Sequence, residues 1–555
     1  MMMAIEVNLS NKKISCTTLS DEYKKFLGGR GLAVKLFTEL VKPRVEPLSP
    51  ENMLIFTTGA LINSRIPMSG RSNATSISPL TNTIFSSNVG GMFGHSLSST
   101  GYDILMVSGG AAQPLYLTIG EKTLLHNAKD IWGKDVFKTT NNLMKKHDVK
   151  EGNIACIGLA GENQNYHGNI MIQKHRAFGR GGLGAVLGYK RLKAIVFKGN
   201  KKRYEPRFKQ LSKRLRKKIA GINTKLKTQG TSGIVNTANK NEAFPTRYFV
   251  TNKFKFADKI NGDVMESHKL KKDTCYSCPV ACKMITKSEK YRIITDGPEY
   301  ETIVFQGSNL GISNFDAIIK SNDLCDRYGL DTISSGNIMG AFIEACERGK
   351  VDYKITWGAV KKVHGLIEKM AHKKGIGIEL QNGTNAFCKK FGIEAMTVKG
   401  LDVPGHDPRA LHGQALGYAT SNRGADHLYS TTYKDEYNHE LRQDISGKAN
   451  LLIRNENRNA VLDSLGLCKF STTFYQDNDY LEIMGVLLER KVSMEEFQSF
   501  GSEIVDMERT FNNKRGFDSS YDALPKRINI PNLKNELKRY YRLRGWSSKG
   551  IVRKK

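Results

Sequence analysis

Four cysteines constrain the fold of this chain more than any other feature of its sequence. Cys275, Cys278 and Cys282 are separated by two and then three residues, and Cys468 lies far downstream in a segment that reads Asp463-Ser-Leu-Gly-Leu-Cys468. Four thiolates are the ligand set of a [4Fe–4S] cluster and, with other local spacing, of structural zinc. Because the fourth ligand is so distant, such a centre would tie two parts of the chain together. The sequence therefore predicts an electron relay held between domains.

Composition indicates whether these cysteines bind a metal or form disulfide bonds. Nine cysteines among 555 residues are few and odd in number, so a secreted disulfide framework is not expected. The first residues show no basic segment followed by an apolar one, and no run of eighteen apolar residues occurs, so neither a signal peptide nor a membrane span is predicted. We expect a cytoplasmic protein with two to four domains.

The chain is strongly basic, with 85 Lys and Arg against 54 Asp and Glu and a formal net charge of +31. Nucleic acid is one partner that such a charge suggests, but the basic stretches 201–227 and 526–555 lack interleaved aromatic residues, so we expect no nucleic-acid partner. In the first stretch, Leu211, Leu215 and Ile219 recur at helical spacing, which predicts an amphipathic helix with a solvated basic face. In a redox enzyme, a positive surface would also speed encounter with an acidic electron carrier such as ferredoxin.

The pattern of secondary structure changes near residue 205. Short β-like runs dominate before that point, at 53–57, 104–108, 115–119 and 194–198, and helical periodicity dominates after it. We predict an α+β protein with a β-rich N-terminal domain that serves as a cofactor base, followed by two mainly helical domains. Their expected ranges are 1–204, 205–395 with the cysteine triplet, and 396–555 with Cys468.

A glycine-rich run, Gly179-Arg-Gly-Gly-Leu-Gly184, formally matches the dinucleotide fingerprint. The charged residues 173–176 before it do not resemble a buried strand, so a nicotinamide site is not favoured. Glycines do let backbone N–H groups approach a phosphate, and Arg176 and Arg180 add positive charge. We expect Gly179 and Arg180 to bind a phosphate-bearing cofactor, with a simple tight turn as the alternative.

Two segments resemble each other: Asp326-Arg-Tyr-Gly-Leu-Asp331 and Asp463-Ser-Leu-Gly-Leu-Cys468. A glycine after a helical turn predicts a C-cap, and the aspartate can accept N–H donors from a ligand. Two copies indicate two similar ligand halves, with a coincidence of two helix ends as the alternative.

Two further groups carry titratable side chains. Glu299 and Glu301 lie close together after the cysteine triplet, and burial with mutual repulsion would raise one pKa enough for general acid/base chemistry. His406, His412 and His427 cluster further along, and by themselves they are typical of structural histidines.

Together these motifs resemble the aldehyde:ferredoxin oxidoreductase family of tungsten or molybdenum bis-pterin enzymes. The resemblance covers nearly the whole chain, and further segments contribute to it. These are 28–31, 47–52, 78–80, 175–182, 273–282, 297–301, 326–334, 418–424, 463–468 and 540–546.

The resemblance implies a role for each matching position. The four cysteines would hold the [4Fe–4S] cluster, and Glu301 would lie beside the active metal. Asp326, Gly329, Leu330 and Asp331 would cradle one pterin, and Asp463, Gly466 and Leu467 the other. The pterin phosphates and a bridging Mg²⁺ would contact Arg71, Asn88, Arg176 and Ala177, with Asn88 and the Ala177 carbonyl nearest the ion.

The sequence departs from the family pattern at two places. Gln414 stands where the archetypal enzyme is expected to have a histidine near the metal, and a neutral amide cannot shuttle protons, so His412 is the candidate substitute. Lys320-Ser-Asn-Asp323 replaces a Glu-x-x-His segment that binds a bridging iron in some members. A homodimer, if formed, would therefore lack that iron.

The implied activity is a two-electron oxidation of an aldehyde to a carboxylate at a tungsten or molybdenum bis-pterin centre. Electrons would leave through the cluster to ferredoxin or a partner iron–sulfur protein. The same cofactors acting on a 2-hydroxy acid, or in a low-potential reduction, are alternatives. A zinc-stapled basic nucleic-acid-binding protein is the alternative from another class, and it leaves the paired D-x-x-G-L segments unexplained.

Overall fold

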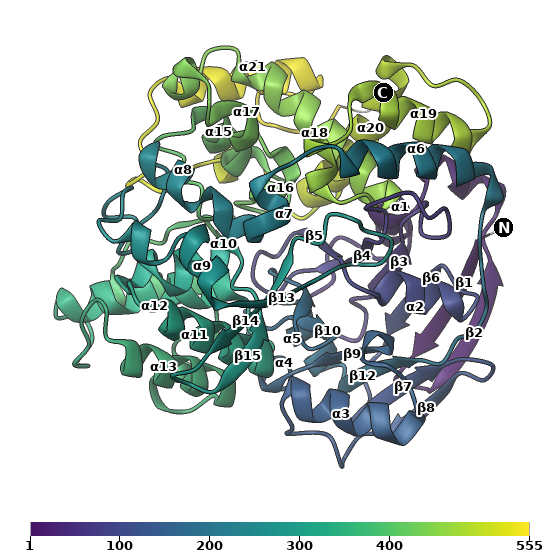
Figure 1. The fold of residues 1–555 in the computed structure, drawn as a ribbon, viewed down its shortest axis with the longest axis horizontal. Helices are drawn as coiled ribbons and strands as arrows, with labels where there is room; N and C mark the ends of the chain where they lie inside the picture. Colours follow the sequence, from purple (N-terminus) through teal and green to yellow (C-terminus); the bar gives the residue numbers. More distant parts are fainter. Residues whose placement is uncertain (1, 554–555) are drawn as a thin grey trace.

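The computed structural model describes residues 2–553 and contains two six-stranded sheets in its N-terminal part (Figure 1). The first sheet has the order β2-β1-β6-β3-β4-β5, with β1 parallel to β6 and the other pairs antiparallel. Its strands are β1 (Met3–Asn8), β2 (Lys13–Thr18), β3 (Leu54–Thr58), β4 (Ser72–Ile77), β5 (Ile84–Val89) and β6 (Ile104–Ser108).

The second sheet has the order β11-β10-β9-β12-β7-β8, with only β12 and β7 parallel. Its strands are β7 (Leu115–Ile119), β8 (Leu124–Asn127), β9 (Ile154–Ile157), β10 (Ile170–Ile172), β11 (Arg176–Phe178) and β12 (Leu192–Phe197). The two sheets share one apolar core, in which the rings of Phe56 and Phe178 lie 5.6 Å apart. Alternate residues of β6 face this core and the opposite core beneath α1, as the period of a strand requires.

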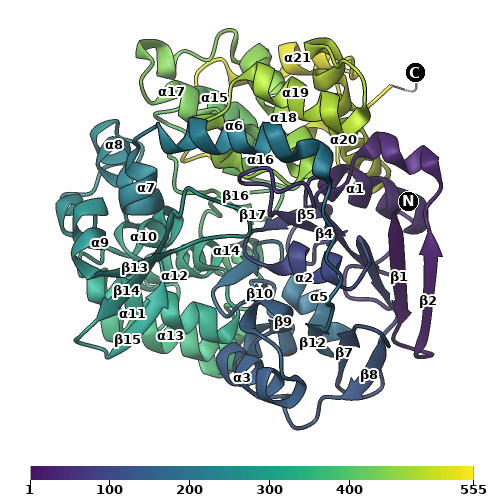
Figure 2. The ribbon, with the colours of Figure 1, turned by 45° about the vertical axis from the view of Figure 1, so that its right-hand side comes forward.

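Helices build the rest of the molecule around these sheets (Figure 2). The N-terminal part contains α1 (Gly29–Leu40), α2 (Phe93–Ser99), α3 (Val136–His147), α4 (Leu159–Glu162) and α5 (Leu183–Tyr189). The middle part contains α6 (Lys209–Ala220), α7 (Lys225–Gln229), α8 (Val235–Lys240), α9 (Gly262–His268), α10 (Tyr300–Gln306), α11 (Phe315–Tyr328), α12 (Thr332–Glu347), α13 (Val360–His372) and α14 (Thr384–Phe391). The last part contains α15 (His412–Thr420), α16 (His427–Ser430), α17 (Tyr433–Glu436), α18 (Lys448–Leu465), α19 (Asp477–Leu488), α20 (Met494–Lys514) and α21 (Leu533–Arg544).

The predicted α+β architecture is confirmed, and all four strand candidates are strands. One feature was missed: the cysteine triplet is flanked by a three-stranded antiparallel sheet of β13 (Lys269–Asp273), β14 (Lys283–Ser288) and β15 (Ile293–Asp296). Strand β13 was not predicted because it is rich in lysine, and an exposed strand need not show alternating polar and apolar residues. A small two-stranded sheet, β16 (Thr397–Val398) and β17 (Leu401–Asp402), follows α14. The domain boundaries after 204 and 395 stay predictions.

The predicted amphipathic helix is α6. Leu211, Leu215 and Ile219 are buried, and its basic residues point mostly outward. Among residues 2–553, none of the helices combines the length and apolarity needed to cross a lipid bilayer.

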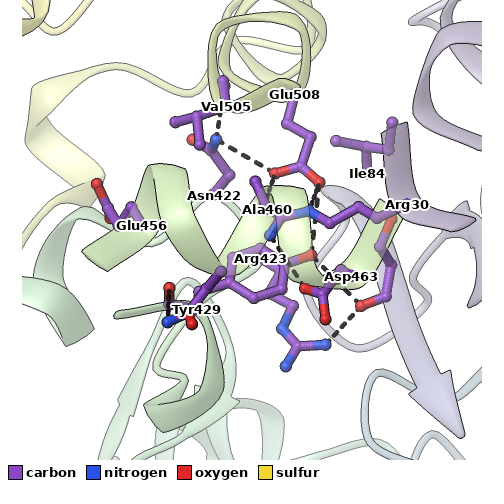
Figure 3. Close-up of polar contacts among 12 residues, drawn as sticks. Arg30, Ile84, Asn422, Arg423, Tyr429, Glu456, Ala460, Asp463, Val505 and Glu508 are labelled. Atoms are coloured by element: carbon purple, nitrogen blue, oxygen red, sulfur yellow. Dashed lines mark hydrogen bonds and ion pairs between the residues drawn. The ribbon is translucent and has the colours of Figure 1, made fainter. Parts of the chain in front are cut away.

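A buried ion network joins α1 to the C-terminal helices (Figure 3). The Arg30 guanidinium donates to both carboxylate oxygens of Glu508 in α20, at 2.8 and 2.7 Å, and lies 3.5 Å from Asp463 in α18. It also stacks over the Tyr429 ring, 3.5 Å from its centroid. Since these ion-pairing side chains are at most 2% exposed, each charge depends on its partner for stabilisation.

We predict that Glu508→Gln lowers the free energy of unfolding by about 3–5 kcal/mol, because it leaves the buried Arg30 charge without its main partner. Urea unfolding of the intact chain measures the change. Glu495→Gln, at an exposed position of the same helix, is the matched control and should change stability by less than about 0.5 kcal/mol. Equal unfolding midpoints for the two variants would contradict the assignment.

Candidate cofactor and active site

A cavity of about 900 Å³ lies where the N-terminal sheets meet the middle and C-terminal helices. A volume of this size is typical of a site for a large ligand. Its lining includes seven of the predicted site residues: Arg71, Arg176, Cys275, Cys278, Cys282, Glu301 and Cys468. Residues almost 400 positions apart in the sequence therefore meet at one place.

The cysteine triplet forms the loop between β13 and β14, and it turns sharply at Ser277 (φ +55°) and Ala281 (φ +49°). Cys468 reaches the same cavity from the segment after α18, where its N–H donates to the Met68 carbonyl at 2.9 Å. All four thiols are half-buried and free of disulfides. Within residues 2–553, no three His, Cys, Asp or Glu side chains are gathered closely enough to hold a single ion.

Arg71 connects the fourth cysteine to one of the repeated segments. Its Nη2 lies 3.6 Å from the Cys468 Sγ, and its backbone N–H donates to the Gly466 carbonyl at 3.0 Å. The buried Nε has no hydrogen-bond partner among the described residues. An arginine in this position can stabilise a thiolate and still donate to an anionic ligand.

The two D-x-x-G-L segments have the same local structure. Each ends a helix, α11 or α18, with a glycine in the left-handed region, Gly329 at φ +71° and Gly466 at φ +80°. The N–H of the following leucine donates to the carbonyl five residues back at 2.8 Å in both, from Leu330 to Cys325 and from Leu467 to Leu462. This is the Schellman geometry. The two segments are both helix ends and a matched structural pair.

Each of these loops packs on a different sheet region. The first contacts the segment before β10, where Asn169 N–H donates to the Gly329 carbonyl at 2.7 Å. The second contacts the segment between β3 and β4, where Ala60 N–H donates to the Ser464 carbonyl at 3.1 Å. A Cβ on Gly59 would lie 2.3 Å from the Gly466 Cα, so only glycine permits this approach. Each repeated loop is therefore held against the N-terminal part by backbone hydrogen bonds.

The aspartates of the two loops are buried and engaged by the protein. Asp326 lies 3.0 Å from the His175 ring, and its pKa is raised well above the usual value by burial and by the neighbouring Asp296. Asp331 caps α12 by accepting from the N–H groups of Ile333 and Ser334. Asp463 pairs with Lys469 at 2.7 Å and with Arg30.

The residues expected near Mg²⁺ lie on the two edge strands that approach each other. Asn88 is in β5 and Ala177 in β11, each at the edge of its sheet. Ser87 of β5 donates to the carbonyl of Gly179 at 2.8 Å and so links the two edges. Arg176 forms ion pairs with Asp296 at 3.1 Å and Glu299 at 3.3 Å. The structure thus brings the two predicted phosphate-binding segments together.

The Arg180 guanidinium is held by the protein through its two Nη atoms, while its Nε has no hydrogen-bond partner among the described residues, and its role toward a phosphate stays a prediction. The guanidinium donates to the carbonyls of Ala425 at 3.1 Å and Asp402 at 2.5 Å and lies 3.7 Å from Asp331. Its sequence context is not a dinucleotide fold either, because β11 runs antiparallel to β10. Arg180 instead holds the N-terminal part against the first repeated loop and the C-terminal part.

Glu301, near the start of α10, is the carboxylate that burial perturbs most in this cavity. One oxygen accepts from the Gly405 N–H at 2.8 Å, and the other lies 3.6 Å from Nδ1 of His427. Burial raises its pKa to about 7. Glu299, by contrast, is paired with Arg176. A carboxyl that titrates near neutral pH can accept a proton from a substrate water.

His406 and His427, which by themselves are typical of structural histidines, both have a ring nitrogen near the Glu301 carboxylate. The His406 ring stacks on Tyr433 at 3.8 Å and on Tyr300 at 4.8 Å, and its Nδ1 lies 2.7 Å from the Tyr437 hydroxyl. Burial lowers the pKa of both histidines, to about 4 for His427. Their closeness to Glu301 had no signal in the sequence beyond the clustering of histidines.

Gln414 and His412 are not part of the described cavity lining. The Gln414 amide donates to Ser430 at 3.0 Å and accepts from Thr432 at 3.0 Å, so it holds the turn that precedes Tyr433. Gln414 therefore lies outside this lining, and its correspondence with a histidine near the metal stays a prediction. Two histidines lie beside the Glu301 carboxylate, His427 from the first position of α16 at 3.6 Å and His406 at 3.9 Å.

Comparisons with known proteins agree with these features. The model of the aldehyde ferredoxin oxidoreductase N-terminal domain matches residues 4–199, and that of domains 2 and 3 matches residues 209–555. Two tungsten-containing aldehyde ferredoxin oxidoreductases, from Thermococcus kodakarensis and Pyrococcus furiosus, are each 36% identical to it. The alignments cover 99% of this chain and 96% and 97% of those proteins.

More distant relatives differ in their names. A WOR-like subunit of an aliphatic sulfonate oxidoreductase from Pyrococcus furiosus is 31% identical over 76% of this chain and 74% of its own. The structure of the active-site complex BamBC of benzoyl coenzyme A reductase with 1,5-dienoyl-CoA superposes with a TM-score of 0.87. It is 21% identical, covers 99% of this chain and 95% of that one, and so shares the fold. The chain belongs to the aldehyde ferredoxin oxidoreductase family of oxidoreductase enzymes.

Proposed function

We propose that this enzyme oxidises an aldehyde to a carboxylate at a tungsten bis-pterin centre and passes the electrons through a [4Fe–4S] cluster to ferredoxin or a partner iron–sulfur protein. The observation that carries the proposal is the cavity that Glu301 shares with four cysteine thiols and two half-buried arginines. The names of its relatives favour tungsten over molybdenum.

The residues present fit these cofactors. The four thiols line one cavity, and the unpartnered Nε atoms of Arg71 and Arg176 are available to anionic groups. Asn88 and the Ala177 carbonyl would hold Mg²⁺ between the pterin phosphates, and the two D-x-x-G-L loops would each hold one pterin. When bound, the metal centre supplies two-electron acceptance and the transfer of a water oxygen to the substrate carbon.

Glu301 would serve as the base of the reaction. With a pKa near 7, a large share of this carboxyl is ionised at neutral pH and can accept a proton from water. His427, 3.6 Å away, is kept neutral by burial, and its lowered pKa makes it a weaker base than Glu301, so it would position the carboxyl rather than take its proton. The stacked rings of His406 and Tyr433 hold this side of the cavity in place. Aldehyde and water yield carboxylate, two electrons and protons.

The substrate is the least constrained part of the proposal. The sulfonate oxidoreductase relative shows that named substrates vary among similar chains. A 2-hydroxy acid or a low-potential reduction would use the same residues. We favour the aldehyde because two full-length relatives carry that name.

Metal analysis of anaerobically purified protein is the first test. We expect about four iron atoms and one tungsten per chain, with the brown absorbance of an iron–sulfur cluster. Stoichiometric zinc in a colourless protein would instead support the zinc-stapled alternative.

The role of Glu301 predicts both a variant phenotype and a pH profile. Its carboxyl is protonated below its raised pKa, so the turnover number should rise with pH through about 7 rather than near 4.5. Glu301→Gln keeps the shape and removes the base, so turnover should fall at least about 100-fold with metal and cluster content unchanged. Steady-state kinetics and metal analysis measure both. Full activity would move the base to another group, with His427 next, and loss of cofactor would make Glu301 structural.

The cysteine assignment predicts different outcomes at two positions, Cys468, which is half-buried, and Cys388, which is buried. Cys468→Ala should strip or cripple the cluster, because it removes one of four ligands. Cys388→Ala is the matched control, since that thiol is buried 3.6 Å from the Tyr248 hydroxyl, and iron content should stay at the parent level. Equal iron in Cys468→Ala and the parent would contradict the four-cysteine site.

A further inference from the structure

The cysteine triplet lies at the surface, although the candidate active site is buried. Thr274 and Pro279 within the loop are exposed, and its three cysteines are half-buried. Glu301, on the opposite wall of the cavity, is enclosed by Gly405 and His427. A group held by the loop would therefore be the part of the electron path nearest to solvent.

Helix α6 packs beside this loop. Its apolar face joins a core cluster with residues of α18, α19 and α20, and Val280 of the loop belongs to the same cluster. Cys278, Cys282 and Cys468 pack against that cluster as well. Figures 1 and 2 show α6 running along the C-terminal helices, so its other face is left to solvent.

A direct contact connects the basic face of α6 to the loop. The Arg216 guanidinium donates to the Ser277 hydroxyl at 2.8 Å and to the Arg65 carbonyl at 3.3 Å. Ser277 lies between the first two cysteines of the triplet. The charge of Arg216 is thus held at the edge of the cluster loop.

Most of the charge on this face is unbalanced. Arg214 and Lys218 form ion pairs with Glu482 and Asp479. In the described part of the chain, no ion pair is formed by four other exposed cations of α6, which are Lys209, Lys213, Arg216 and Lys217. On the opposite flank of the loop, β13 exposes Lys271 and Lys272 directly before the triplet. Unpaired positive charge therefore borders the loop from two sides.

We propose that this surface, formed by Lys213, Arg216 and Lys217 of α6 with Lys271 and Lys272 of β13, is the docking site of an acidic one-electron carrier protein. The proposal rests on the proposed function. Each two-electron oxidation would reduce two carriers by one electron each, with the electrons leaving through the cluster. Positive charge at the exit would attract an acidic carrier and orient its redox centre toward the loop.

The test compares two charge reversals in the holoenzyme. Lys213→Glu with Lys217→Glu alters the proposed surface. Lys534→Glu with Lys538→Glu makes the same charge change at the same spacing on the exposed side of α21, which both views place away from β13. The probe is a recombinant acidic [4Fe–4S] ferredoxin, whose binding is titrated calorimetrically and whose reduction is followed at low salt. A small neutral dye serves as the second electron acceptor.

We expect the α6 variant to lose at least about tenfold in kcat/KM for ferredoxin, with weaker ferredoxin binding and a flatter salt dependence. Its rate with the dye and the ferredoxin rate of the α21 variant should both stay within about twofold of the parent. The parental ferredoxin rate should fall steeply between about 0.1 and 1 M salt, as the Debye length shrinks from about 10 to about 3 Å.

Parental ferredoxin kinetics in the α6 variant, or equal losses in both variants, would overturn the docking site. A different partner for this surface would also overturn it. The result would be that duplex DNA binds the parent and no longer binds the α6 variant, while the α6 variant still binds ferredoxin. Failure of the proposed function is a separate result. It would appear as absence of aldehyde oxidation with the dye, whereas calorimetric binding of ferredoxin needs no turnover and still tests the surface.

Discussion

Backbone pairing between residues 59–71 and residues 464–468 is the interaction on which the candidate site depends. Ala60, Leu61 and Arg71 donate to carbonyls of the second segment, and Cys468 donates back to Met68. These bonds bring the fourth thiol to the cavity that the cysteine triplet lines, and they hold the second repeated loop on the N-terminal part. Since the pairing excludes side chains at Gly59 and Gly466, a Cβ at either position would push the fourth thiol away from the cavity.

Two sheets and two capped helix ends give the site an approximate internal repetition. Each repeated loop ends a helix with the same hydrogen bond and packs on its own part of the N-terminal base. The edge strands β5 and β11 then meet between the two halves. Such a paired arrangement is what the proposed bis-pterin ligand would require. The buried Arg30–Glu508–Asp463 network keeps α18, and hence the second loop, fixed to α1.

The electrostatics of the molecule differ between its interior and its surface. Inside, burial raises the pKa of Glu301 and lowers that of His427, which leaves a weak acid beside a neutral imidazole. Outside, unpaired lysines and arginines border the cysteine loop. The proposed base therefore titrates near neutral pH in the interior, and the proposed docking surface carries unpaired positive charge. The cavity connects the two regions through the four thiols.

Local periodicity and turn chemistry are enough to predict the α+β class, the principal strands, the amphipathic α6 and the likeness of the two D-x-x-G-L segments, because these features depend on residues that are close in the chain. The sequence also pointed to the four cysteines. Three of them have a recognisable spacing within one loop, and Cys468 ends the second D-x-x-G-L segment. Only the tertiary structure decided which side chains lie beside Glu301. His427 and Gln414 differ by thirteen positions in a helical region, and the packing of α15 and α16 turns Gln414 into a structural amide and His427 toward the carboxylate. The commitment of Arg180 to backbone carbonyls was likewise decided by contacts more than 200 residues away, which no local pattern records.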